Sequence, residues 1–134
     1  MSFLDRIIAR MPFVVVDVET TGVSRHDRVL ELAMVLVRGN EEPRVILDTL
    51  VNIGGPVKAT EIHGIRDEDI RGAPGFAAIA DQVMAAMANR MLAAHNARFD
   101  VGMLGRELER VGGPRAFPYW CTICLLYTSD AADE

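Results

Sequence analysis

A run of apolar residues that ends in two acids constrains this chain more than any other feature of its sequence. Residues 13–22 read FVVVDVETTG, so four consecutive apolar residues precede Asp17, and Glu19 follows it. Valine and phenylalanine favour strands, and an uninterrupted apolar run is typical of a strand buried in a sheet. Charged side chains are rarely buried without a partner, because removing an ion from water is costly. The pattern therefore predicts a buried strand with a cation bound at its end.

The spacing of the acids indicates which cation this would be. Residues two apart in a strand project from the same face, so we expect Asp17 and Glu19 to point the same way. Mg²⁺ and Mn²⁺ prefer oxygen ligands, and commonly bind one or two carboxylates together with a substrate phosphate. A third acid, Asp100, lies in the first turn of a predicted helix after a later strand, which an open sheet could place beside the first. The three acids could share one metal site, although Asp17 alone could cap a turn and Asp100 alone could suit a helix N-terminus.

Length and charge set the outer limits on function. The 134 residues suit one domain with a single core, and no apolar run approaches the roughly 20 residues of a membrane span, so we expect a soluble, cytoplasmic protein. Residues 1–12 mix charged and apolar side chains, which is typical of a short amphipathic helix and not of a signal peptide. The net charge of −5 argues against binding polyanions by bulk attraction. Any contact with nucleic acid should therefore be local, for example through metal ions.

The remaining pattern predicts an α/β layout. Apolar, β-branched runs bounded by polar turns indicate strands, and apolar residues spaced three and four apart indicate helices packed on a sheet. Methionines on the first helix fall on its apolar face and are expected in the core. The expected strands are residues 13–18, 28–37, 44–52, 91–95 and 119–123, and the expected helices are residues 76–90 and 97–111.

Three motifs occur in an order and spacing that resemble those of the DnaQ-like 3′→5′ exonucleases, the DEDD superfamily, and in particular its DEDDh type. They are DVETTG at residues 17–22, IHGI at residues 62–65 and AHNARFD at residues 94–100. The resemblance spans residues 13–122 and includes proteins like the epsilon subunit of DNA polymerase III. It implies a ribonuclease H-like fold, with a mixed five-stranded sheet flanked by helices. It also implies removal of nucleotides from single-stranded DNA or RNA 3′ ends, with a DNA polymerase subunit as a candidate partner.

The resemblance also implies roles for individual residues. Asp17 and Glu19 would bind the catalytic metal ion, Glu19 would help to hold the attacking water, and Asp100 would serve a second ion, both ions being Mg²⁺ or Mn²⁺. Thr20, Thr21 and His63 would contact the terminal nucleotide. Two such ions can activate water and stabilise the leaving oxygen of a phosphodiester, which is the chemistry that clustered acids support. Glu31, inside the second expected strand, resembles a further ligand, yet nothing in the pattern assigns it that role.

The C-terminal part of the chain departs from the family pattern. These exonucleases carry His-x-x-x-x-Asp on a C-terminal helix, with the histidine as general base, and no such pair follows Thr122. Residues 124–134, CLLYTSDAADE, resemble a translated sequencing adaptor, so we expect an incomplete exonuclease domain over residues 1–123 without its C-terminal helical part, and an inactive fragment. Cys121 and Cys124 form C-x-x-C, but the second pair that a zinc ribbon needs is absent. The alternative is a non-catalytic module of the same fold that binds nucleic-acid ends or a polymerase, although such a module has no need of three acids.

Overall fold

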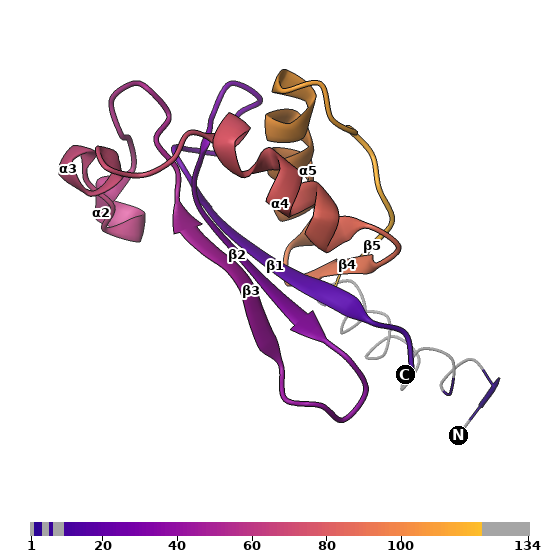
Figure 1. The fold of residues 1–134 in the computed structure, drawn as a ribbon. Helices are drawn as coiled ribbons and strands as arrows, with labels where there is room; N and C mark the ends of the chain where they lie inside the picture. Colours follow the sequence, from indigo (N-terminus) through magenta and orange to yellow (C-terminus); the bar gives the residue numbers. More distant parts are fainter. Residues whose placement is uncertain (1, 4–5, 7–9, 122–134) are drawn as a thin grey trace, which may run out of the picture.

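The computed structural model describes residues 2–3, 6 and 10–121, and these form a five-stranded mixed sheet with helices on one side (Figure 1). The strand order is β3-β2-β1-β4-β5, in which β1 pairs antiparallel with β2, β2 antiparallel with β3, β1 parallel with β4, and β4 parallel with β5. The strands are β1 (Phe13–Thr20), β2 (Val29–Val37), β3 (Arg44–Leu50), β4 (Met91–Ala94) and β5 (Tyr119–Cys121).

Alternation along β1 explains how the sheet divides into two faces. Val14, Val16 and Val18 are buried, whereas Asp17 between them is exposed. Because side chains alternate along a strand, the even-numbered positions of β1 form the floor of the core and the odd-numbered positions face the other way. The predicted buried strand is therefore buried on one face only, and its acids belong to the opposite face.

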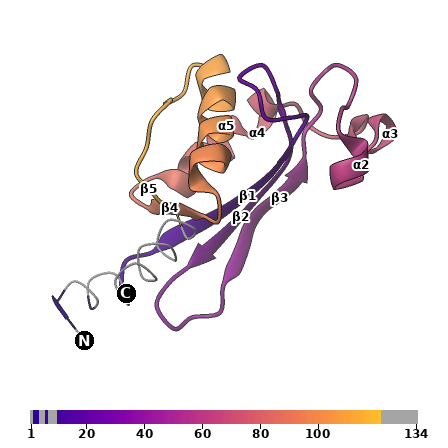
Figure 2. The ribbon, with the colours of Figure 1, turned by 180° about the vertical axis from the view of Figure 1, so that it is seen from behind.

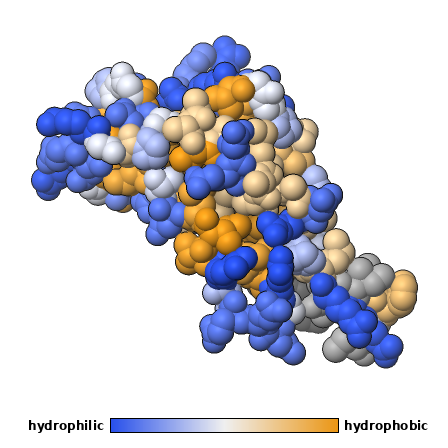
Figure 3. All heavy atoms as spheres, in the orientation of Figure 1, coloured by the Kyte–Doolittle hydropathy of each residue, from blue (hydrophilic) through white to orange (hydrophobic). Residues whose placement is uncertain are grey.

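Two long helices cover the apolar face. They are α4 (Phe76–Met87) and α5 (Ala97–Arg110), and both lie on the same side of the sheet in opposite views (Figures 1 and 2). Phe76, Ile79 and Val83 of α4 belong to the same core cluster as the valines of β1, as the apolar spacing predicts. Figure 3 shows apolar surface over α4 and the neighbouring part of the sheet, where Met84 and Met87 are only partly buried against the core.

Two helices of one turn each form an extension of the molecule beyond the end of β1 (Figure 1). They are α2 (Thr60–His63) and α3 (Asp67–Ile70), and sequence periodicity does not predict them because each is too short to show any. Ile65 and Ile70 are buried in a small second core with Leu30 of β2. This packing holds the segment that carries His63 near the end of the sheet.

The expected element boundaries agree with the structure to within a few residues where they can be compared. The strand predicted at residues 44–52 ends at Leu50, and the helix predicted to reach residue 111 ends at Arg110. Residues 122–134, with the predicted boundary at residue 123 and Cys124, lie outside the described residues, as does most of the predicted N-terminal helix. Within the described residues no helix combines the length and apolar character needed to cross a membrane.

Candidate active site at the end of β1

Acids from three strands lie on the sheet face that α4 and α5 leave uncovered. Asp17 and Glu19 point to this face, as their spacing predicts. In the register of the sheet Glu19 lies opposite Glu31 of β2, and Ala33, the partner of Asp17, lies opposite Asp48 of β3. Because directly paired residues project from the same face, all four carboxylates share it.

Asp100 reaches these acids from α5. Strand β4 pairs with β1 only over Phe13–Val15, after which the chain leaves the sheet and enters α5. The Asp100 carboxylate hydrogen bonds with the backbone at Val18, beyond the end of that pairing, and with the backbone at Asn96. Its side chain is buried, at 7% exposed. The parallel placement of β4 beside β1 thus brings Asp100 to the acids of β1, although Glu19 precedes it by 81 positions.

The electrostatics show how close this approach is. The pKa of Asp100 is raised from 3.8 to about 6, mainly by burial, then by the charge of Asp17 and to a smaller extent by that of Glu19, while two backbone hydrogen bonds oppose the rise. The pKa of Glu31 is also raised, first by burial and then by Asp48, Glu19 and Asp17. Like charges therefore repel one another across the end of the sheet, which is a common property of catalytic sites.

The carboxylates of Asp17, Glu19 and Asp100 suit divalent cations, although the three side chains do not converge on one point. Across the described part of the chain, no three His, Cys, Asp or Glu side chains are arranged closely enough to hold a metal ion. Asp17 is exposed and Glu19 is half-buried, so both side chains have room to turn toward Asp100. All three side chains are carboxylates, whose oxygen atoms are ligands that Mg²⁺ and Mn²⁺ prefer. A bound cation would also relieve the repulsion between the three acids. Asp17, Glu19 and Asp100 are thus the residues that could hold such ions.

Thr20 and Thr21 are buried at the end of β1, and their hydroxyl groups bond within the following loop. The Thr20 hydroxyl donates to the Gly22 carbonyl at 2.7 Å. The Thr21 hydroxyl donates to Asp27 Oδ1 at 2.8 Å and accepts from the Arg28 N–H at 2.9 Å. A Cβ on Gly22 would lie 2.6 Å from Asp27 Oδ2, so a larger residue there would displace the Asp27 carboxylate that bonds to Thr21. Contact of either threonine with a nucleotide stays a prediction.

His63 ends α2, and both of its ring nitrogens bond to the backbone of its own loop. Nδ1 accepts from the Ile65 N–H at 3.0 Å, and Nε2 lies 2.8 Å from the Lys58 carbonyl oxygen. Since a carbonyl oxygen can only accept, the ring carries its proton on Nε2. A protonated His63 would lower the pKa of Glu31, which places the ring near the acids. His63 therefore orders its loop beside the site, and its contact with substrate also stays a prediction.

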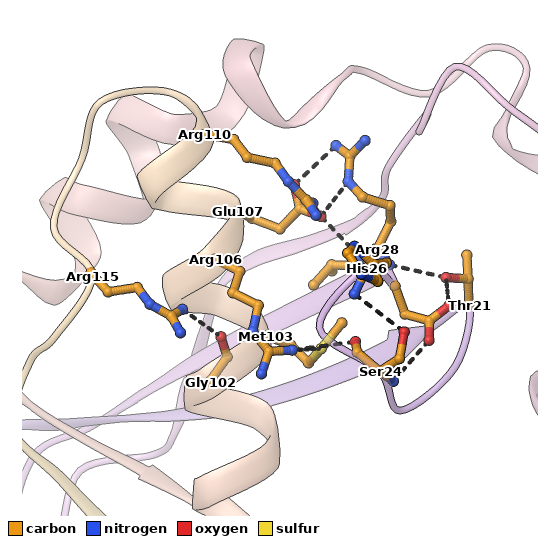
Figure 4. A network of polar contacts seen from close by, with 12 residues as sticks. Thr21, Ser24, His26, Arg28, Gly102, Met103, Arg106, Glu107, Arg110 and Arg115 are labelled. Carbon is orange, nitrogen blue, oxygen red and sulfur yellow. Dashed lines mark hydrogen bonds and ion pairs between the residues drawn. The ribbon is translucent and has the colours of Figure 1, made fainter.

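Sequence reasoning missed a second buried acid, Glu107, which is 1% exposed (Figure 4). Arg28 donates to it through Nε at 2.7 Å and Nη2 at 3.0 Å, and Arg110 donates through Nη1 at 3.0 Å. Arg28 and Glu107 are 79 positions apart, so no local pattern links them. The available signal was an acid seven residues after Asp100, on the same face of the predicted helix.

Comparisons with known proteins agree with this geometry. The model of the RNase T exonuclease family matches residues 14–132. The chain is 36% identical over 118 residues to a DNA polymerase III PolC-type protein of Oceanobacillus iheyensis, a match that covers 84% of this chain and 8% of that protein. It is 35% identical over 121 residues to a DNA polymerase III subunit epsilon-like protein of Rhodobacter capsulatus, covering 87% of this chain and 17% of that protein. The chain thus spans less than a fifth of the length of these relatives.

Solved structures with the same fold include two exonucleases. A zinc-bound complex of E. coli ExoI with single-stranded DNA has a TM-score of 0.75 at 18% identity, covering 91% of this chain and 30% of that one. The nuclease domain of 3′hExo, a DEDDh family member bound to rAMP, has a TM-score of 0.60 at 12% identity, covering 80% of this chain and 62% of that one.

The chain belongs to the RNase T exonuclease family. The predicted DnaQ-like resemblance and the ribonuclease H-like fold are thereby confirmed, whereas the DEDDh type stays a prediction.

Proposed function

We propose that this chain is the catalytic domain of a metal-dependent 3′→5′ exonuclease. The observation that carries the proposal is the placement of Asp100 against the backbone of Val18, where it comes under the charges of Asp17 and Glu19. A buried, repelling set of carboxylates destabilises a fold, and it is expected where cations are bound for catalysis. Membership of an exonuclease family supports the reaction class.

In this proposal Asp17, Glu19 and Asp100 hold two ions of Mg²⁺ or Mn²⁺. Such ions, when bound, lower the pKa of water and neutralise charge on a phosphodiester. Asp17 and Glu19 bind the first ion, Glu19 orients the attacking water, and Asp100 binds the second ion. Thr20, Thr21 and His63 line the end of β1 and bind the terminal nucleotide.

We propose the 3′ end of single-stranded DNA as the substrate, and a cytoplasmic DNA polymerase as the partner in proofreading. The similar proteins named as DNA polymerase III PolC-type and epsilon-like support this choice, as does the ExoI structure with single-stranded DNA. RNA ends are the second choice, supported by the 3′hExo domain bound to rAMP. The acidic net charge of −5 is consistent with contacts confined to the metal-bound end of the strand.

A general base is also part of the proposal. The sequence has histidines only at positions 26, 63 and 95, and the ring of His63 is engaged by its own loop. We therefore propose that residues 1–123 act together with a C-terminal His-x-x-x-x-Asp segment, that residues 124–134 are foreign to the domain, and that the 134-residue chain by itself turns over slowly. A positioned general base contributes roughly 10²–10⁴-fold, so the difference should be large.

The test is release of mononucleotides from a 3′-labelled single-stranded DNA with Mn²⁺. We expect the chain extended with a His-x-x-x-x-Asp segment to be at least about 10²-fold faster than the 134-residue chain. Asp17→Asn in the extended chain should abolish release, whereas Glu109→Gln, at an exposed position of α5, should not. Equal turnover by the two lengths would refute the role given to the segment. Full activity of Asp17→Asn would refute the site itself.

A further inference from the structure

The four buried polar side chains of the described residues all lie where α5 meets the ends of β1 and β2. They are Thr20, Thr21, Asp100 and Glu107. Two of them, Asp100 and Glu107, are acids on α5, and a buried charge destabilises a fold unless it is fully paired. Their presence at one junction indicates that the junction has a function besides packing.

Glu107 is fully engaged by groups at the start of β2. It accepts two hydrogen bonds from the Arg28 guanidinium, one from the Val29 N–H at 3.1 Å and one from Arg110. The paired, fork-like geometry between arginine and carboxylate fixes orientation as well as distance. Arg28 is about one-third exposed, so the pair lies between the core and the surface (Figure 4).

The Arg28–Glu107 pair is linked to the acids of β1 through a short path of hydrogen bonds. The backbone N–H of Arg28 donates to the Thr21 hydroxyl at 2.9 Å, and the N–H of Thr21 donates to the Arg28 carbonyl at 2.9 Å. The pairing of β1 with β2 is irregular at this point, because Glu19 lies opposite Glu31 but Thr20 lies opposite Val29. Glu107 therefore holds the chain at the irregularity that directly follows Glu19.

The same helix carries Asp100 seven residues earlier. Seven residues make about two turns, so the two acids lie on the same side of α5, about 10 Å apart along its axis. Asp100 bonds to the backbone of β1 at Val18, and Glu107 bonds to the backbone of β2 at Val29. Two anchors on one rigid helix set both its position and its rotation over the strand ends.

We propose that Glu107, held by Arg28, is a positioning residue for the metal site: it fixes α5 on the strand ends so that Asp100 stands at the required distance from Asp17 and Glu19. This inference rests on the proposed function, because it concerns the same three acids. Groups that hydrogen bond directly to metal ligands typically contribute about 10–100-fold to metal affinity, and Glu107 acts less directly, through α5, so we expect roughly a 3–10-fold contribution. Loss of the Arg28–Glu107 pair should therefore weaken metal binding even in protein that stays folded.

The test measures Mn²⁺ affinity of the 134-residue chain, from the free-ion signal in electron paramagnetic resonance, at a temperature where circular dichroism shows each variant folded. Glu107→Gln should weaken Mn²⁺ binding by roughly 3–10-fold. Arg28→Lys keeps the charge but loses the paired geometry, and should give a smaller loss. The matched control is Glu109→Gln, which removes the same charge from the same helix at an exposed ion pair with Arg115 and should leave the affinity unchanged.

The outcomes separate this proposal from the proposed function. If Glu107→Gln lowers the melting temperature but leaves the Mn²⁺ affinity of the folded protein unchanged, the positioning role is wrong. An equal loss of Mn²⁺ affinity in Glu109→Gln would show that only the net charge of the chain matters, and would also overturn the positioning role of Glu107. If Glu107→Gln does not fold, the Mn²⁺ affinity of folded Arg28→Lys decides: an unchanged affinity would overturn the positioning role. Absence of Mn²⁺ binding by the unsubstituted chain would contradict the proposed function, and this proposal with it.

Discussion

Asp100 stands at a position where stability and the proposed function oppose each other. Its carboxyl group is buried beside two other acids, so the charged form is disfavoured and its pKa rises to about 6. Relative to the ordinary pKa of 3.8, this corresponds to a loss of about 3 kcal/mol of folding free energy at neutral pH in the absence of cations. Sites for charged ligands commonly carry such costs, because the ligand supplies the missing charge.

The first prediction concerns the pH dependence that follows from this shift. A carboxyl group with a higher pKa in the folded state binds its proton more tightly there, so the free energy of unfolding should fall as the pH rises from about 4 to about 6. Asp100→Asn should reduce this fall, leaving the part that comes from the raised pKa of Glu31, and should stabilise the metal-free chain at pH 7 by about 1–3 kcal/mol, less whatever its lost hydrogen bonds contribute. Urea unfolding from pH 4 to pH 7, with EDTA present, measures both effects.

Asp81 of α4 provides the matched control for that measurement, because it is an exposed acid on a helix of the same domain. Asp81→Asn should leave the pH dependence between 4 and 6 as it is in the unsubstituted chain. If Asp100→Asn retains the same fall in stability, Asp100 is not the group that titrates there, and its burial beside Asp17 is not what the structure indicates.

At the scale of elements, α5 links the core to the site, and its two glycines have different surroundings. A Cβ on Gly105 would lie 2.6 Å from the backbone carbonyl oxygen of Arg115, in the segment that crosses the helix before β5. A Cβ on Gly102 would meet nothing within 4 Å. Close packing of α5 against the backbone at Arg115 thus requires glycine at position 105, whereas position 102 has room for a larger residue.

The second prediction uses this contrast. Alanine in place of glycine inside a helix is favourable by about 1 kcal/mol where space allows, so Gly102→Ala should stabilise the chain by up to that amount. Gly105→Ala should instead destabilise it by about 1–3 kcal/mol, because rigid backbone must move. Thermal unfolding of the two variants compares them directly. Equal stabilisation by both would mean that the segment around Arg115 does not pack on α5.

Sequence alone predicted the elements that periodicity and β-branching can indicate, and not those set by distant contacts. The valines of β1 and the apolar stripe of α4 each show a repeat that matches the observed burial, so their identity and inner faces were predicted correctly. The one-turn helices α2 and α3 are too short to show a repeat. The pairing of Arg28 with Glu107 depends on how α5 is placed over β2, which no local pattern records.

In the candidate site, too, sequence predicts the features set by local patterns and not those set by distant contacts. The shared face of Asp17 and Glu19 follows from strand geometry, and the approach of Asp100 follows from a parallel β4 beside β1. The hydrogen bonds that engage His63 could not be predicted, because they depend on the left-handed turn at Gly64, whose φ is 76°. The sequence pattern assigns no role to Glu31, because register, and not sequence spacing, places it opposite Glu19.

At the scale of the whole molecule, the fold separates a packed face from a charged one. Both long helices cover the same side of the sheet (Figures 1 and 2). The register of the strands places the acids of β1, β2 and β3 on the other side. Asp100 is the acid that reaches this group from a helix, around the short end of β4. The central claim is therefore that Asp17, Glu19 and Asp100, from different elements, bind the same ions.

The measurement that tests this claim most directly is anomalous X-ray diffraction from crystals of the chain grown with Mn²⁺. The proposal predicts an anomalous peak at the end of β1, with carboxylate oxygens of Asp17 and Asp100 about 2.0–2.3 Å from Mn²⁺ and Glu19 beside it. Asp17→Ala crystals grown in the same way should lose that peak. A Mn²⁺ peak elsewhere on the molecule, or one at Asp17 with the Asp100 carboxylate turned away from the ion, would contradict the claim.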